Sequence, residues 1–84
     1  MPPLQFCKLR IEEFTRMVPS IIGRSVTDEK TITDVVHLDE FSLYSLNCIF
    51  TFCDGTSAHG GYRHVSGDRT LFVYLDGEKT FIAI

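Results

Sequence analysis

The hydrophobic positions near the start of the chain follow the spacing of a helix. Ile11, Phe14 and Val18 recur at intervals of three and four residues, which places them on one face of a helix over residues 8–18. The charged residues between them, Glu13 among them, are expected on the opposite face, in water. This segment is therefore predicted to be an amphipathic helix with one buried side.

Pro19 sets the expected end of this helix. Proline has no backbone N–H and disfavours helical angles at the residue before it, so the helix should stop or kink here. Ser20–Gly23 can then add only a short further turn, which Gly23 would close. Ahead of the helix, residues 4–7 are predicted to form a short first strand.

Beyond Gly23 the spacing changes to that of strands. Residues 31–38 are rich in β-branched side chains, and residues 43–53 show the clearest alternation in the chain. In that second segment a single face collects the large apolar side chains, namely Tyr44, Leu46, Cys48, Phe50 and Phe52. Two consecutive strands are predicted here, and the second has one apolar face.

Turn signals divide the rest of the chain into hairpins. Asp54-Gly55 and Asp76-Gly77 are strong hairpin signals, and Ser66–Asp68 forms a further turn between them. The strands that they connect are expected over 56–65, 71–75 and 80–84. The predicted fold is a single α+β domain over residues 1–84, with one N-terminal helix packed on an antiparallel β-sheet of four to five strands in a meander.

The last hairpin is apolar on both faces. With a two-residue Asp76-Gly77 turn, Phe72 is opposite Phe81 on one face and Leu71 is opposite Ile82 on the other. Antiparallel strands with one wet face usually alternate apolar and polar residues, and one short helix covers only one side of a sheet. The second side must therefore be covered by the segment 20–26, by a second copy of the chain, or by a different protein.

Composition and charge narrow the classes of function. Of the 84 residues, 44% are hydrophobic, which is enough for one compact core and excludes a disordered chain. The net charge is −3 and the basic residues are scattered, which disfavours a dedicated nucleic-acid binder. Three cysteines without CxxC spacing and the absence of a long apolar run indicate a reduced, cytoplasmic protein without a membrane span.

The segment 53–64 holds most of the chemically versatile side chains. A metal site is the first interpretation, because zinc takes nitrogen and sulfur ligands. Its candidate ligands are Cys53, His59 and His64, with Cys48, Asp54 or Cys7 as a fourth. His59 and His64 are five residues apart and would point to opposite faces of a strand unless the glycines between them form a bulge, which disfavours this site.

Two further interpretations involve chemistry at the same segment. Cys53 has the residue type of a nucleophile that His59 or His64 could activate, assisted by an acid such as Asp54 or Asp68. A cysteine in a Phe-rich strand is more often a small buried hydrophobic residue, and this favours a structural role. Alternatively, the segment Gly60–His64 could contact a small ligand or a phosphate through its glycine backbone.

The structural interpretation of Gly60-Gly61 is a β-bulge or kink in a curved sheet. It competes with the ligand site, because a phosphate-binding diglycine normally lies between a strand and a helix. No such arrangement is expected here, and no paired carboxylates indicate glycosidase chemistry. No metal or other cofactor is expected, and the chain is predicted not to be an enzyme.

In size and α+β character the chain resembles the small accessory proteins of phages and other mobile elements, such as anti-CRISPR inhibitors. That resemblance implies a protein-binding module, an inhibitor or adaptor that occludes a surface of a larger complex, and a homodimer is a further possibility. The alternative is a small-ligand or nucleotide-binding protein that uses Gly60–His64. The residues expected to contact a protein partner are aromatic and basic, namely Tyr62, Arg63, His64, His59, Phe72, Tyr74 and Phe81.

Overall fold

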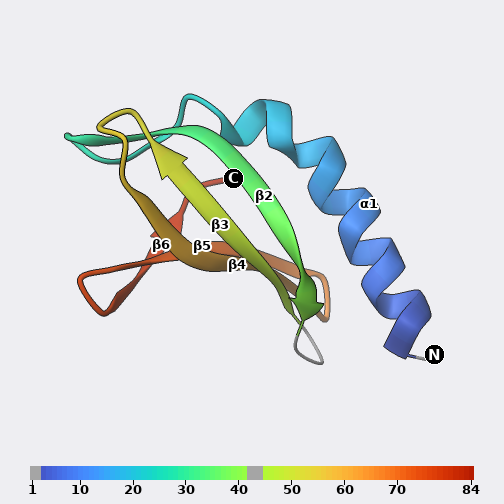
Figure 1. Ribbon diagram of the computed structural model, residues 1–84. Helices are drawn as coiled ribbons and strands as arrows, with labels where there is room; N and C mark the ends of the chain where they lie inside the picture. Colours follow the sequence, from blue (N-terminus) through green and yellow to red (C-terminus); the bar gives the residue numbers. More distant parts are fainter. Residues whose placement is uncertain (1–2, 42–44) are drawn as a thin grey trace.

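The computed structural model describes the backbone of residues 3–41 and 45–84, and the side chains of residues 8–38 and 45–84. Tyr44, which was predicted to share the buried face of its strand, lies outside this part of the chain. Within the described residues, one helix precedes six strands, and Figure 1 shows their arrangement. They are α1 (Pro3–Ile21), β1 (Ser25–Thr27), β2 (Lys30–Phe41), β3 (Ser45–Phe52), β4 (Ser57–Val65), β5 (Asp68–Leu75) and β6 (Glu78–Ile82).

The strands form a single antiparallel meander in the order β1-β2-β3-β4-β5-β6. The predicted fold class is confirmed, with one strand more than the four to five expected. The additional strand is β1, which a turn at residues 28–29 joins to β2. Its three residues are too few to show an alternating pattern in the sequence, and this is why it was missed.

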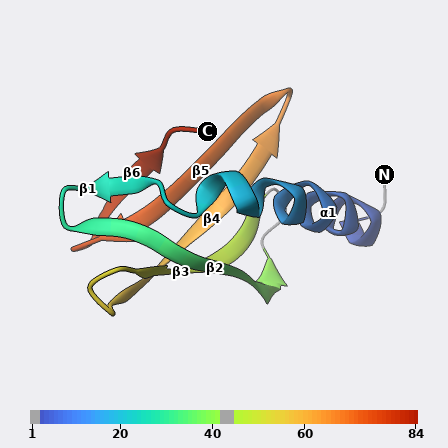
Figure 2. The ribbon, with the colours of Figure 1, turned by 90° about the horizontal axis from the view of Figure 1, so that it is seen from above.

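The sheet is strongly curved and nearly closes on itself. Seen from above, β1 and β6, the first and last strands of the order, lie side by side (Figure 2). The curvature gives the sheet a concave inner face and a convex outer face. A curled sheet of this kind can bury one continuous core on its inside with the help of a single helix.

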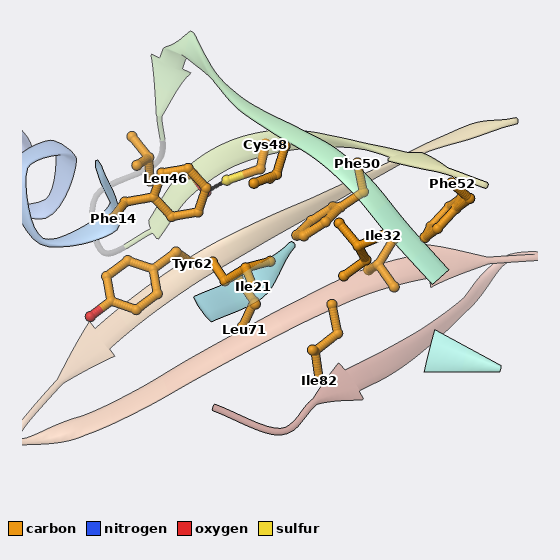
Figure 3. Packing of buried hydrophobic residues seen from close by; sticks show 12 residues of the cluster. Phe14, Ile21, Ile32, Leu46, Cys48, Phe50, Phe52, Tyr62, Leu71 and Ile82 are labelled. Atoms are coloured by element: carbon orange, nitrogen blue, oxygen red, sulfur yellow. Dashed lines mark hydrogen bonds between the residues drawn. The ribbon is translucent and has the colours of Figure 1, made fainter. Parts of the chain in front are cut away.

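The core fills the inner face and is almost entirely apolar. Along β3 the even-numbered residues are buried and their neighbours are less so, which confirms the predicted alternation. Figure 3 shows that α1 and the strands from β2 to β6 contribute to one cluster. Its members are Phe14, Ile21, Ile32, Val35, Leu46, Cys48, Phe50, Phe52, Tyr62, Leu71, Val73 and Ile82.

Helix α1 packs on this core through the predicted face, but it is longer than predicted at both ends. Residues 4–7 are helical, so the prediction of a first strand there was wrong. Pro19 lies inside the helix, where the N–H of Ile22 still donates to the carbonyl of Val18 at 3.1 Å. The complete burial of Ile21 outweighs the one hydrogen bond that Pro19 removes. Over the described residues, no helix combines the length and the apolar character that a membrane crossing requires.

The predicted hairpin turns are confirmed. In the turn between β5 and β6, Asp76 and Gly77 have φ angles of 51° and 81°, as a turn with two left-handed residues requires. The resulting register places Phe72 opposite Phe81 and Leu71 opposite Ile82, as the sequence predicted. This register decides which aromatic side chains of the hairpin point away from the core.

Candidate protein-binding surface

Three aromatic side chains of the last hairpin lie on the outer face of the sheet. We refer to Phe72, Tyr74 and Phe81 as the aromatic patch. Leu71 and Ile82, their neighbours along the strands, point inward to the core. Tyr74 and Phe81 expose 45% and 66% of their surface, so no described segment covers them.

Phe72 is the centre of the aromatic patch. It is buried but does not belong to the core cluster, because neighbouring side chains of the outer face cover it. Its ring meets that of Tyr74 edge to face, with 5.7 Å between the centroids. The two rings therefore hold each other in a defined geometry, and the aromatic patch is an ordered surface rather than a set of isolated side chains.

The two glycines of β4 create the space for rings on both sides of the sheet. A Cβ on Gly61 would lie 2.8 Å from the ring of Phe72 on the outer face, and one on Gly60 would lie 2.7 Å from the ring of Phe50 on the inner face. The pairing of β3 with β4 runs through both glycines without a register shift. Of the predicted bulge or kink in a curved sheet, the bulge is therefore wrong, and the glycines allow close packing in a regular ladder of the curved sheet.

The apolar surface continues from the aromatic patch toward β2. Val36, Ile49 and His59 are cross-strand neighbours in one row of the outer face. Val36 is about half exposed and Ile49 is partly exposed. Together with the aromatic patch they form a continuous outer surface that crosses the sheet from β2 to β6.

Two basic side chains flank this surface. The ammonium group of Lys79 lies 4.5 Å from the centroid of the Phe72 ring and 5.9 Å from that of Tyr74, within the range of a cation–π contact. Arg63 is exposed on the outer face of β4, two residues beyond Gly61. Neither of them forms an ion pair with a described residue, so both charges face solvent.

Tyr62 was predicted to contact a partner at the rim of this surface, but it lies in the core. Its side chain is completely buried and packs against Phe14, with 6.1 Å between the ring centroids (Figure 3). The segment 58–64 is part of strand β4, as the sequence predicted, and successive side chains of a strand alternate between its two faces. Tyr62 and His64 therefore point inward, whereas His59 and Arg63 point outward and remain candidates for partner contact.

A polar cluster that the sequence did not reveal connects α1 to β4. One carboxylate oxygen of Glu13 accepts a hydrogen bond from the Tyr62 hydroxyl at 3.1 Å and lies 2.9 Å from Nδ1 of His64. The other oxygen lies 3.1 Å from the Arg10 guanidinium. The expectation that Glu13 faces water was wrong, because the curved sheet meets a wider arc of the helix than the apolar stripe alone.

The cluster changes the titration of its members. Burial raises the pKa of Glu13. The hydrogen bonds from His64 and Tyr62 and the charge of Arg10 lower it by more, so that the net pKa lies below the ordinary 4.5. Burial and the adjacent Glu13 carboxylate raise the pKa of Tyr62 to about 12. The ionised carboxylate and the neutral phenol are therefore the stable pair at neutral pH.

We expect the Glu13 cluster to contribute stability that is lost in acid. Because the folded-state pKa of Glu13 is below its unfolded value, the contribution is complete above about pH 5 and declines as the pH falls through 4.5 and below. Thermal melting of wild type and Glu13→Gln between pH 3 and pH 7 measures this directly. The difference in melting temperature should shrink toward low pH, and a constant difference would contradict the proposed role of the charge.

The structure separates the groups considered for a metal site or a nucleophile. His59 and His64 lie on opposite faces of β4, as predicted for an unbulged strand. No three His, Cys, Asp or Glu side chains converge on a common point within the described residues. The side chain of Cys7 lies outside them.

The two described thiols occupy different environments. Cys48 is in the core, where burial raises its pKa to about 12 and disfavours the reactive thiolate. Cys53, expected to be buried, is exposed in the turn after β3, with its Sγ 3.5 Å from the carbonyl oxygen of Glu29. Strand β3 ends one residue earlier than predicted, and this accounts for the difference.

A second interaction that the sequence did not reveal ties two turns together. The Lys30 ammonium group donates to the carboxylate of Asp54 and, at 2.7 Å, to the hydroxyl of Thr56. These contacts hold the Asp54 pKa well below its usual range. Lys30 also lines an open cleft of about 570 Å³, together with Glu29, Glu78 and residues of β5. The contacts of Lys30 with Asp54 and Thr56 link the start of β2 to the turn between β3 and β4 at one end of the curved sheet.

No protein-family model, curated protein or solved structure matches this chain. The proposals below therefore depend on the geometry and chemistry of the described residues.

Proposed function

We propose that this chain is a protein-binding module that acts by occluding a surface of a larger partner. The observation that supports the proposal is the position of the aromatic patch. The core is complete on the inner face, yet Tyr74 and Phe81 remain exposed on the outer face beside Val36. The exposed surface of these aromatic side chains adds little to the stability of the fold, whereas large aromatic side chains dominate the binding energy of protein interfaces.

The geometry also explains why a protein partner is favoured over a small ligand at Gly60–His64. The space beside Gly60 and Gly61 is filled by the rings of Phe50 and Phe72, so the glycine backbone is not open to a phosphate. The convex outer face offers a broad surface of the kind used in interfaces. Binding without chemistry is consistent with an inhibitor or adaptor, and a host defence complex stays our prediction for the target.

Affinity capture from a bacterial lysate tests this function when patch variants are compared with a matched control. Phe81→Ser and Tyr74→Ser remove exposed apolar surface from the outer face, and Leu9→Ser removes the exposed Leu9 from helix α1. We expect the tagged wild type and Leu9→Ser to retain the same stoichiometric partner and the two patch variants to lose it. Equal capture by all four proteins would place the binding surface elsewhere.

Light scattering of the pure protein separates a target from a second copy. If the outer face pairs with itself, the wild type is a dimer and Phe81→Ser is a monomer. A monomeric wild type that still captures a partner supports a heterologous target.

A further inference from the structure

We infer that the partner presents an acidic surface to the outer face, with carboxylates around an apolar site that receives the aromatic patch. This inference rests on the proposed function and names the chemistry of the partner. It follows from the charges of the described side chains around the patch, which are positive, whereas the net charge of the chain is −3.

Among the described side chains, the cross-strand rows around the patch contain basic but no acidic residues. The central row runs from Asn47 through Gly61 and Phe72 to Phe81. Lys79, opposite Tyr74, lies in the row on one side, and Arg63, opposite Thr70, lies in the row on the other. Among the side chains that the structure describes, no carboxylate occupies these three rows, although the net charge of the chain is −3.

Both charges are available to a partner. Arg63 lines a hollow of about 400 Å³ at the β4–β5 end of the outer face, and Asp68 on the same hollow forms no ion pair with it. Lys79 lies over the rings of Phe72 and Tyr74, which position its ammonium group beside the patch. A guanidinium and an ammonium group that flank exposed rings are complementary to carboxylates around an apolar site.

The same charges disfavour a second copy as the occupant. In a twofold-symmetric dimer a surface meets itself, so the basic rows around the two patches would face each other. Like charges brought together in an interface cost binding energy and suppress the wrong partner. An acidic protein surface removes this repulsion and adds attraction at both flanks of the patch.

Two synthetic peptides of equal length test the inference on the full chain. One has twelve residues in which Leu and Phe alternate with Glu, and in the other Lys replaces each Glu. Amide chemical shifts in a two-dimensional NMR titration report both the affinity and the site. We expect the Glu peptide to shift resonances around Phe72, Tyr74 and Phe81, and the Lys peptide to bind at least about tenfold more weakly.

Charge variants identify the residues responsible. Arg63→Glu and Lys79→Glu should each weaken the Glu peptide about fivefold or more, and Arg63→Gln and Lys79→Gln should have smaller effects. Arg16→Glu, on an exposed part of α1, is the matched control and should change the affinity less than twofold. Melting curves confirm that each variant is folded.

Equal binding of the two peptides, no binding of the Glu peptide, or full affinity in the Arg63 and Lys79 variants would overturn the inference. So would binding of a single-stranded dT12 oligonucleotide at the same resonances in preference to the Glu peptide, because the face would then recognise nucleic acid. The proposed function fails separately. If Phe81→Ser abolishes partner capture while Arg63→Glu and Lys79→Glu retain it, the protein-binding role stands and the charge inference falls.

Discussion

Replacing Gly60 with alanine is expected to destabilise the protein by at least about 3 kcal/mol, the upper range for overpacking a tight core. A Cβ at this position would lie 2.1 Å from the carbonyl oxygen of Phe72 and 2.9 Å from the Cα of Val73. Both atoms belong to the backbone of β5, which pairs on both sides and cannot move without breaking a ladder. For 84 residues the total stability is about 4–13 kcal/mol, so the loss is a large fraction of it.

Gly77→Ala is the control for this substitution. Gly77 is left-handed, with a φ of 81°, but a Cβ there meets no atom within 4 Å. Its replacement should lower the stability by only about 1–2 kcal/mol, which is the cost of left-handed backbone angles for alanine. Urea unfolding gives the free energy of unfolding of both variants, and it compares the steric clash in Gly60→Ala with the backbone strain in Gly77→Ala. A Gly60→Ala protein as stable as Gly77→Ala would contradict the packing of β4 against β5.

Tyr62→Ala is expected to cost about 3–5 kcal/mol, as for other large core aromatics. The side chain is completely buried, its ring contacts Phe14, and its hydroxyl donates to Glu13. Tyr62→Phe keeps the ring and loses only the hydrogen bond, which should cost about 0.5–1.5 kcal/mol. Chemical unfolding of both variants separates the two contributions. If Tyr62→Ala melted like wild type, Tyr62 would be a surface residue and the orientation of β4 would be wrong.

The hairpins could be predicted because their signals are local. Asp76-Gly77 and Ser66-Gly67 adopt the left-handed angles that their residue types favour, and β3 alternates from Leu46 to Phe52 as one buried face requires. The pairing of Phe72 with Phe81 followed from turn length alone. These features depend on neighbours in sequence, and the sequence contains them.

The orientation of β4 could not be predicted from its own residues. Gly60 and Gly61 interrupt the alternation of apolar and polar side chains, so no pattern shows which face is buried. The face of Tyr62 is set by its cross-strand neighbours Leu46 and Leu71, both completely or nearly completely buried. Such pairing depends on residues that are distant in the sequence. The Glu13 cluster and the continuation of α1 past Pro19 also depend on distant residues, because they rest on contacts with the sheet.

The candidate surface was predicted in part. The aromatic patch was anticipated from the two apolar faces of the last hairpin, and its exposure follows from the register of β5 and β6. The role of Lys79 was missed, because its contacts with Phe72 and Tyr74 cross the hairpin. Arg63 and His59 were predicted as partner contacts from their residue types alone. Both lie on the outer face, and their contact with a partner stays a prediction.

The central claim is that the outer face binds a protein partner, and calorimetry with the purified captured partner tests it most directly. Phe81→Ser should raise the dissociation constant about 30-fold or more, as for an interface hot spot, whereas loss of its cross-strand contact with Phe72 should cost at most about 1 kcal/mol of stability. Leu9→Ser, which alters an exposed apolar residue of α1, should leave both quantities unchanged. Full affinity in Phe81→Ser together with a loss in Leu9→Ser would contradict the account and move the binding surface to the helix.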